Sequence, residues 1–451
     1  MNAWRDGISP EALSAVSATA LSQGCFGDAE RSVVFHDLGK MRSRVRELSR
    51  CFPAQSLHAV AIKANPLVEV LKEVVAEGAG LEAASFEEIR IGLAAGALPE
   101  RLVFDSPAKT RDELAEALAL GVIINADNFD ELERIHALRS NTGLSNRIGL
   151  RVNPMVGAGN IGITSVADGG SKFGVNIETE RERILTAFRR YSWLRGLHAH
   201  VGSQGCGLEL LVAGAVRLVE LMGEIDAITG GKQLAFVDIG GGLSTQYVEG
   251  ERAPGIDEYA TLLKQRAPDL FHDRIQLITE FGRALQAGCG FALSRVEYVK
   301  DLAGKPLAVI HLGADMLMRP VYLPEQWQHR FLVLDPSGRL KTGDPVPWTI
   351  GGPLCFAGDI VVRGAPLPAV EPGDYIAVRD VGAYTLSMWS RHCSRAMPLV
   401  IGFSGPQPEL RVLRHAETPA GMAEFWSLGT SRGSSEARAV SAPVDDAAER
   451  V

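Results

Sequence analysis

The chain contains 451 residues, carries a net charge of -8 and has six cysteines. This length suits two domains, one of which could be a barrel of about 250 residues. The acidic balance, without a run of lysine or arginine, argues against nucleic acid as a partner. The cysteines form no C-x-x-C pair, and this spacing favours reduced thiols over disulfides or a zinc site. Because the sequence shows no secretory signal and no long apolar run, we expect a cytoplasmic protein without a membrane span.

Residues 1–30 give no clear assignment, and the first regular pattern runs from about residue 58 to residue 285. There, apolar or β-branched runs alternate with segments of helical period, which predicts repeated βα units and a parallel sheet. Eight such units in about 230 residues favour a (β/α)8 barrel over an open doubly wound sheet. We place this barrel domain at residues 31–285. The eight candidate strands are "HAVAIK", "LEAAS", "RLVFD", "VIINA", "RIGLRV", "LHAHV", "AFVDI" and "IQLITE".

After residue 285 the helical pattern gives way to short strand-like segments separated by proline and glycine, such as "DLAGKPLAVIHLG" and "VVRGAPLPAVEPGDYIAV". This texture predicts an all-β second domain over residues 286–428. From about Gly429 the chain is small, polar and charged. We expect residues 429–451 to form a disordered tail.

Lys63 stands at the end of the apolar run "HAVAIK", where Asn65-Pro66 stops the strand. One interpretation is a lysine whose stem packs on apolar surface while its ammonium stays in water. The other is a desolvated, nucleophilic amine that forms a Schiff base. The remaining strand ends bear on this choice, because the carboxyl ends of barrel strands converge on one mouth. Their polar residues, each of which alone fits an ordinary core or surface role, are Glu82, Ser85, Arg151, His200, Ser203, Asp238, Glu280 and Arg283.

Three consecutive glycines, Gly240 to Gly242, follow the seventh candidate strand in "FVDIGGGLSTQY". Without Cβ atoms, their amides can approach an anion closely, so a phosphate site is one interpretation and an ordinary turn is the other. A position at a barrel mouth favours the phosphate site. A lysine, a phosphate cradle and an acid at one mouth are the groups needed to hold pyridoxal 5'-phosphate (PLP).

Motifs in a fixed order run through both predicted domains: "AIKANP", "LEAAS", "SKFGV", "HAHVGSQ", "DIGGGL", "EFGRAL", "GGPLCFAGD" and "VGAYTLSMWSRHCS". Together they resemble the motifs of the fold type III PLP-dependent decarboxylases, the family that includes diaminopimelate and ornithine decarboxylases. The resemblance covers roughly residues 30 to 405 and is nearest to the diaminopimelate branch. It implies the barrel with a β domain after it, PLP as cofactor and decarboxylation of an amino acid.

The resemblance also implies a role for each matching residue. Lys63 would bind PLP covalently, His200 would stack on its ring, and Glu280 would pair with its pyridine nitrogen. Cys355 would reprotonate the product carbon in the active site of the other subunit, which implies a homodimer with shared sites. No metal ligand is expected. The cofactor-binding set is completed by Glu82, Arg151, Ser203, Gly240, Gly241, Gly242, Arg283 and Tyr384.

Departures from the family pattern concern the substrate. Phe356 replaces the acidic residue that follows the cysteine in relatives, where it pairs with a distal ammonium of the substrate. Arg319 and Tyr322 resemble the R-P-x-L-Y segment that helps to hold a substrate carboxylate, and Arg391 is a further candidate on the substrate side. We therefore expect an amino acid without the usual distal ammonium.

Several alternatives stay open at this point: a true diaminopimelate decarboxylase, a racemase or epimerase on the same barrel, an inactive PLP-binding regulator, and a metal-dependent aldolase. Glu280 disfavours the racemase, because related racemases place an arginine beside the pyridine nitrogen. The presence of both Lys63 and Cys355 disfavours the inactive regulator. The sequence offers no convincing chelating pair of His, Asp or Cys, which disfavours the aldolase.

Overall fold

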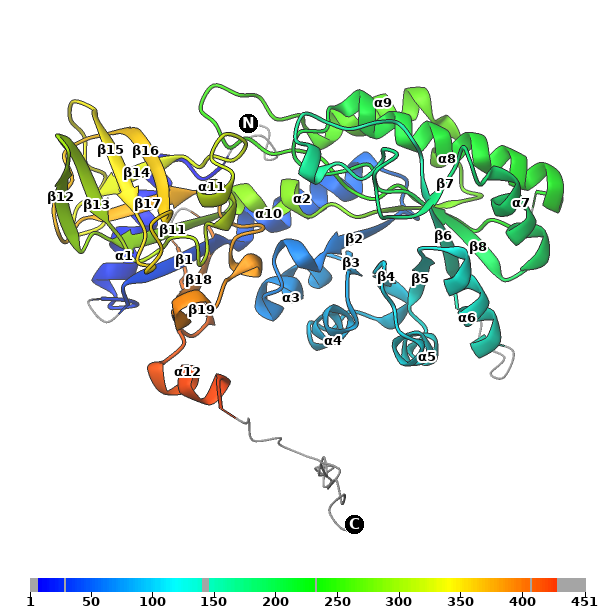
Figure 1. The fold of residues 1–451 in the computed structure, drawn as a ribbon, viewed down its shortest axis with the longest axis horizontal. Helices are drawn as coiled ribbons and strands as arrows, with labels where there is room; N and C mark the ends of the chain where they lie inside the picture. The colour runs from blue at the N-terminus through cyan, green and yellow to red at the C-terminus, as the bar shows by residue number, and fades with distance from the viewer. Residues whose placement is uncertain (1–6, 28–29, 140–145, 232, 406–407, 428–451) are drawn as a thin grey trace, which may run out of the picture.

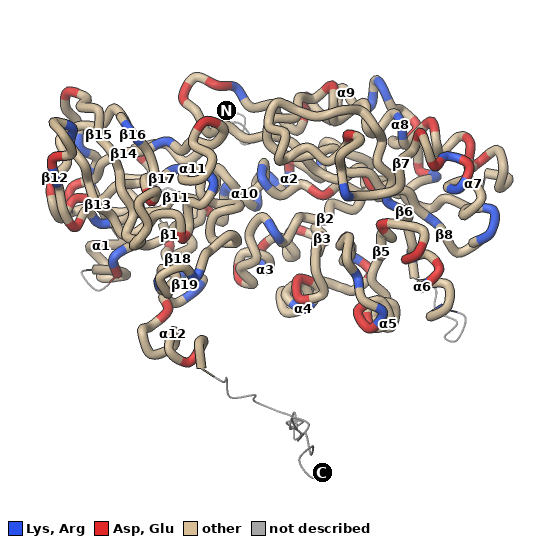
Figure 2. Tube along the Cα trace, viewed as in Figure 1, with Lys and Arg blue, Asp and Glu red and all other residues tan. Residues whose placement is uncertain are grey.

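The structure is a computed structural model that describes residues 7–27, 30–139, 146–231, 233–405 and 408–427. A barrel with helices around it lies beside a domain built of sheets (Figure 1). The predicted tail, residues 429–451, lies outside the described residues. Within the described ranges, no helix combines the length and the apolar character needed to cross a membrane. Lysine and arginine are interspersed with aspartate and glutamate along the outer helices rather than gathered in one stripe (Figure 2).

The barrel consists of parallel strands that close on themselves. One sheet of nine strands has the order β5-β4-β3-β2-β10-β9-β8-β6-β7, and a further pairing joins β5 to β6. The terminal strand β7 (Val175–Asn176) is attached to β6, so the other eight close the barrel. These eight coincide with the predicted strands, and the predicted (β/α)8 barrel is confirmed. They are β2 (Leu57–Ala61), β3 (Gly80–Ala83), β4 (Leu102–Phe104), β5 (Ile123–Ala126), β6 (Ile148–Asn153), β8 (Leu194–His198), β9 (Phe236–Asp238) and β10 (Gln276–Thr279).

Helices connect the strands and cover the outside of the barrel (Figure 1). α5 shows why they form where they do: Thr110 and Glu113 close a capping box at its start, and Gly121 ends it with a φ of 85°. Leu114 and Leu118 form its buried face. The barrel helices are α2 (Leu38–Cys51), α3 (Val68–Ala76), α4 (Phe86–Ala94), α5 (Arg111–Leu120), α6 (Phe129–Arg139), α7 (Arg181–Arg190), α8 (Leu208–Thr229), α9 (Ile256–Arg266) and α10 (Arg283–Gln286).

An apolar cluster fills the barrel interior. Its members are Leu57, Ala59, Val103, Ile123, Phe236 and Ile278. The Phe236 ring occupies the space beside Gly149 and Gly196: a Cβ atom at Gly149 would lie 3.0 Å from that ring, and one at Gly196 would overlap it. Because side chains fill the interior, the polar residues that follow the strands lie at the open mouth.

The second domain contains two sheets. The six-stranded sheet has the order β14-β17-β11-β1-β18-β19, and the four-stranded sheet has the order β12-β13-β15-β16. The strands are β1 (Ser32–Asp37), β11 (Gly290–Arg295), β12 (Tyr298–Leu302), β13 (Lys305–Val309), β14 (Phe331–Leu334), β15 (Val346–Gly351), β16 (Ile360–Leu367), β17 (Tyr375–Arg379), β18 (Leu399–Phe403) and β19 (Arg411–Arg414). Two short helices, α11 (Met318–Tyr322) and α12 (Pro419–Phe425), also belong to this part of the chain.

The amino-terminal segment belongs to the second domain rather than to the barrel. β1 pairs antiparallel with β11 and parallel with β18, although the sequence analysis assigned residues 31–285 to the barrel. The helix α1 (Pro10–Ser22) contributes Leu13 and Val16 to the cluster that buries Phe35 and Phe291. The difference arises because an apolar run predicts a strand but does not identify the distant strand with which it pairs.

Candidate active site

A cavity of about 460 Å³ opens at the carboxyl ends of the barrel strands, with walls from both domains. The predicted site residues that line it are Lys63, Arg151, His200, Ser203, Gly242, Glu280, Arg283, Arg319 and Tyr384. Two larger hollows, of about 660 and 870 Å³, lie elsewhere and are not lined by Lys63 or Glu280. The concentration of ionisable groups, rather than the volume, therefore marks the cavity at the mouth as the candidate active site.

Lys63 lies on the 3-10 turn η1 (Ile62–Ala64), directly after β2. Its Nζ atom donates to the carboxylate of Glu82, a fully buried residue of β3. The side chain is 39% exposed because it faces the cavity, whereas its ammonium lies among buried acids. Burial lowers the pKa of Lys63, but Glu82, Tyr384 and Glu280 outweigh this effect and raise the pKa above its usual value. The amine is therefore paired inside the mouth and is not a snorkelling surface lysine.

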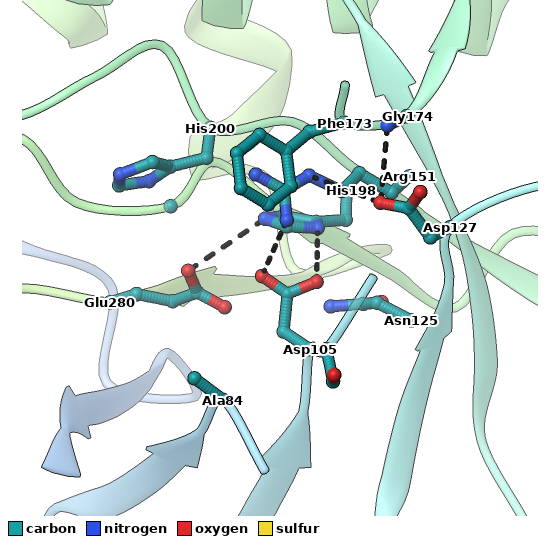
Figure 3. Close-up of polar contacts among 12 residues, drawn as sticks. Ala84, Asp105, Asn125, Asp127, Arg151, Phe173, Gly174, His198, His200 and Glu280 are labelled. Carbon is teal, nitrogen blue, oxygen red and sulfur yellow. Dashed lines mark hydrogen bonds and ion pairs between the residues drawn. The ribbon is translucent and has the colours of Figure 1, made fainter. Parts of the chain in front are cut away.

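His198, the last residue of β8, lies between two carboxyl groups (Figure 3). Its Nδ1 atom is 3.3 Å from Asp105 Oδ1, and its Nε2 atom is 3.7 Å from Glu280 Oε2. Arg151 Nη1 donates to the other oxygen of Asp105 at 3.3 Å. Burial tends to raise the pKa of Asp105, but Arg151 and then His198 outweigh burial and hold that pKa well below its usual range. Asp105 is therefore an ionised carboxylate inside the barrel mouth.

Glu280 follows β10 and presents a carboxyl group to the cavity. Its Oε1 atom is buried and has no hydrogen-bond partner within the described part of the chain. Burial, and then the charges of Asp238, Asp105 and Glu82, raise the pKa of Glu280 well above its usual value. A cation placed at this oxygen would relieve both the burial and the repulsion.

The three glycines after β9 form a surface that excludes side chains. Gly240 and Gly242 have φ values of 66° and 109°. A Cβ atom at Gly242 would lie 2.7 Å from the carbonyl oxygen of Gly202, and one at Gly241 would collide with the backbone of Glu280. The chain can pass so close to its neighbours only because these positions are glycine.

Two arginine side chains, those of Arg283 and Arg319, also line the cavity. Arg283 Nε donates to Ser203 Oγ at 3.2 Å, and its guanidinium lies 4.4 Å from the centre of the Tyr384 ring. Arg319 lies 4.8 Å from the same ring. Burial, and then the charge of Arg283, lower the pKa of Arg319 to about 10. Together with Gly242, these groups make one side of the cavity suitable for anions.

Residues 38–287 match the family described as "Pyridoxal-dependent decarboxylase, pyridoxal binding domain". The chain belongs to this family. Diaminopimelate decarboxylase of Pseudomonas aeruginosa is 32% identical over 352 residues, which cover 77% of this chain and 81% of that protein. The same enzyme of Methanothermobacter thermautotrophicus is 32% identical over 371 residues, 80% of this chain and 83% of the relative. The crystal structure of the Helicobacter pylori enzyme complexed with L-lysine superimposes with a TM-score of 0.79 at 27% identity, and covers 90% of this chain and 98% of that one.

These comparisons confirm the resemblance read from the motifs. The decarboxylase is a PLP-dependent carboxy-lyase of fold type III that acts on an amino acid. The residues at the mouth fit the cofactor, because one cavity is lined by the lysine Lys63, by the anion-binding groups Ser203, Gly242 and Arg283, and by Glu280, whose Oε1 atom has no hydrogen-bond partner among the described residues. The alternatives of an inactive regulator and a metal-dependent aldolase are therefore set aside.

Seven predicted site residues of the decarboxylase do not line the cavity of their own chain. Three of them adjoin residues that do, because Glu82 binds Lys63 and Gly240 and Gly241 precede Gly242. The other four belong to the second domain. Cys355 is exposed on the loop between β15 and β16. The ring of Phe356 stacks on that of Tyr322, with centroids 5.7 Å apart. Arg391 does not line the mouth and pairs with Glu417 at 2.5 Å. The two residues are 26 positions apart in the sequence, so the local sequence around Arg391 does not reveal this partner.

Asp105 and His198 also line or adjoin the mouth, but neither was predicted as a site residue. A usable signal existed for both, since Asp105 ends the candidate strand "RLVFD" and His198 is the first histidine of "HAHVGSQ". Conversely, Ser85 was singled out at a strand end, but its hydroxyl accepts the Glu88 amide and caps α4. Strand-end position alone does not separate a side chain that faces the mouth from one that starts the next helix.

Proposed function

We propose that this decarboxylase acts on an amino acid without a free distal ammonium group and works as a homodimer with shared active sites. The observation that carries the substrate proposal is the stack of Phe356 on Tyr322, with an interplanar angle of 26°, at the position where relatives place an acid. Burying an unpaired ammonium costs several kcal/mol, of which a cation-π contact offsets about 2 kcal/mol. Because both rings lie outside the cavity of their own chain, they would meet the substrate bound to a second copy, and a distal ammonium would bind poorly against them.

Asp359, the nearest acid further along the loop, does not replace the missing carboxylate. It is buried and accepts the amides of Ala314 at 2.7 Å and Leu354 at 2.8 Å. Releasing it would leave both amides without these bonds, and each unsatisfied buried group costs about 1–3 kcal/mol. Asp359 supports the proposal because its carboxylate is already used to hold the loop.

In this proposal, five residues that line the mouth would each have a task. PLP supplies, when bound, an electron sink for the bond to the departing carboxylate. Lys63 would hold the cofactor through its amine, and Glu280 would face the pyridine nitrogen. The amides around Gly242, with Arg283 and Ser203, would hold the phosphate, because amides and a guanidinium match its charge and shape.

The proposal for the dimer rests on the position of Cys355. In relatives this cysteine donates a proton to the product carbon, yet here its thiol is exposed and outside the cavity of its own chain. A second copy of the chain that presents this loop to the mouth would bring Sγ and the reacting carbon together. Arg319, whose Nη1 is buried without a hydrogen-bond partner among the described residues, would hold a substrate carboxylate.

A second candidate is a true diaminopimelate decarboxylase. The observation that favours it is the similarity to enzymes of that name, 32% identical over 352 residues for the Pseudomonas aeruginosa relative. The two candidates differ only in how the distal end of the substrate is recognised, so one experiment separates them.

The experiment measures carbon dioxide release from a panel of D and L amino acids that includes meso-diaminopimelate, L-ornithine and L-lysine. We expect a less cationic amino acid to be preferred, and Phe356→Glu to raise diaminopimelate turnover by about tenfold or more. Phe356→Leu, which removes the ring without adding charge, is the matched control and should not produce this gain. Efficient diaminopimelate turnover by the natural chain, unaffected by either substitution, would establish the second candidate.

A further inference from the structure

The contact chain Asp105–His198–Glu280 joins the ends of three barrel strands. Asp105 follows β4, His198 ends β8 and Glu280 follows β10, and all three side chains are at most 5% exposed. The imidazole lies between the two carboxyl groups, with Nδ1 towards Asp105 and Nε2 towards Glu280 (Figure 3). Asp105 and His198 have no role in the proposed function.

Asp105 is held from its other side. Arg151 Nη1 donates to its Oδ2 atom at 3.3 Å, and the Arg151 guanidinium lies 4.4 Å from the centre of the Phe173 ring. Asp127 lies 4.0 Å from Arg151 Nε and also accepts the amide of Gly174 at 3.1 Å. The imidazole therefore meets a carboxylate whose position is fixed and whose charge is retained.

The buried groups at the mouth carry more acids than cations. The carboxyl groups are Glu82, Asp105, Asp238 and Glu280, and the cations facing them are Lys63 and Arg151. His200 does not add a charge, because burial and then Arg151 lower its pKa well below its usual value. His198 is the remaining group that faces Asp105, Asp238 and Glu280 together. The two ring nitrogens of His198 face carboxyl oxygens of Asp105 and Glu280 and have no hydrogen-bond partner among the described residues. An imidazolium in this position would donate to both carboxyl groups, because both of its ring nitrogens carry a proton.

We infer that His198, placed beside Asp105, is a positioning residue that directs Glu280 at the pyridine nitrogen of PLP. This inference rests on the proposed role of Glu280. If His198 acts by orienting Glu280, it strengthens cofactor binding only when the ligand has the pyridine nitrogen that Glu280 would face. A merely structural histidine would affect any ligand of the same shape equally.

The test compares PLP with the analogue in which a CH group replaces the ring nitrogen. Apo-protein of the full chain is titrated with each, and dissociation constants are read from protein fluorescence. We expect the natural chain to prefer PLP, and His198→Gln to weaken PLP by about tenfold while leaving the analogue unchanged. Asp105→Asn, which retains the imidazole, should reduce the preference in the same direction and serves if His198→Gln does not fold.

Asp127→Asn is the matched control, because it also removes a carboxylate beside Arg151 but does not face His198. It should keep the preference for PLP over the analogue. Equal weakening of both ligands by His198→Gln and Asp105→Asn would overturn the inference while leaving the proposed function intact. Failure of the natural chain to bind PLP would refute both. Asp105, His198 and Glu280 also place possible metal-ligand atoms within 4.8 Å of one another. The inference would be overturned as well if the PLP-bound protein contained stoichiometric Zn²⁺ and His198→Gln abolished that zinc content.

Discussion

Gly242→Ala should separate cofactor binding from stability. At a φ of 109°, a Cβ atom costs about 1–2 kcal/mol of backbone energy. It would also lie 2.7 Å from the Gly202 carbonyl oxygen, where an ordinary contact begins at 3.4 Å. The neighbouring chain must therefore move by several tenths of an ångström, and Ser203 moves with it. A displacement of this kind at a binding site reduces affinity by about tenfold or more.

Gly121→Ala is the matched control for this substitution. Gly121 ends α5 at a φ of 85°, and a Cβ atom there would meet nothing within 4 Å. In urea unfolding of the apo-protein, Gly121→Ala should lose about 1–2 kcal/mol in the free energy of unfolding, and Gly242→Ala should lose more because its Cβ atom also meets the Gly202 carbonyl oxygen. Only Gly242→Ala should show weaker PLP binding in a fluorescence titration. If Gly242→Ala binds PLP as tightly as the natural chain, the argument for a phosphate cradle at these glycines is wrong.

Three further predictions follow from the described contacts. Lys63→Ala should abolish covalent attachment of PLP, tested by borohydride reduction and peptide mapping, and a label on another lysine would contradict the assignment. Mixed Lys63→Ala and Cys355→Ala chains should regain part of the activity, because a heterodimer rebuilds one intact site; no recovery despite demonstrated subunit exchange would count against shared sites. Burial, with the charge of Arg44, lowers the pKa of His36 to about 4. Between pH 6.5 and pH 4 the unfolded chain therefore binds a proton that the folded chain does not. The free energy of unfolding consequently falls as the pH falls through this range. Removing this histidine as His36→Gln should reduce the loss of stability between pH 7 and pH 5 by about 2 kcal/mol in urea unfolding, and an unchanged loss would contradict it.

The barrel could be predicted from the sequence because its signal is local. Each strand is a short apolar run, and each helix has its own apolar face and end signals, as α5 shows with Thr110 and Gly121. Lys63 and Glu280 could be placed at one mouth for the same reason, since every strand of a parallel barrel ends on the same side. The glycine run was informative because a missing Cβ has a direct geometric consequence.

What the sequence did not reveal depends on pairings between distant segments. β1 lies beside β11, more than 250 residues later, and no local pattern distinguishes that partner from the barrel strands. Arg391 was expected near the substrate, but its charge is used by Glu417. The contacts of Asp105 with His198 also depend on the stagger of β4 relative to β8, which is a property of the closed barrel rather than of either strand.

The mouth carries both acids and arginines, and this combination can suit a ligand that is anionic at one end and cationic at the other. The acids Glu82, Asp105, Asp238 and Glu280 come from β3, β4, β9 and β10 or directly follow them. Gly242, Ser203 and Arg283 line the same cavity, and Arg319 from the second domain joins them. Lys63 lies among the acids, where Glu82 holds its amine. A phosphate near the acids would be repelled, and a protonated ring nitrogen near Arg283 would be repelled equally. Under the proposed function, these charges would favour the orientation of PLP in which the ring nitrogen faces Glu280 and the phosphate faces Gly242, and Arg319 and Tyr384 would add the second domain to the wall of that cavity.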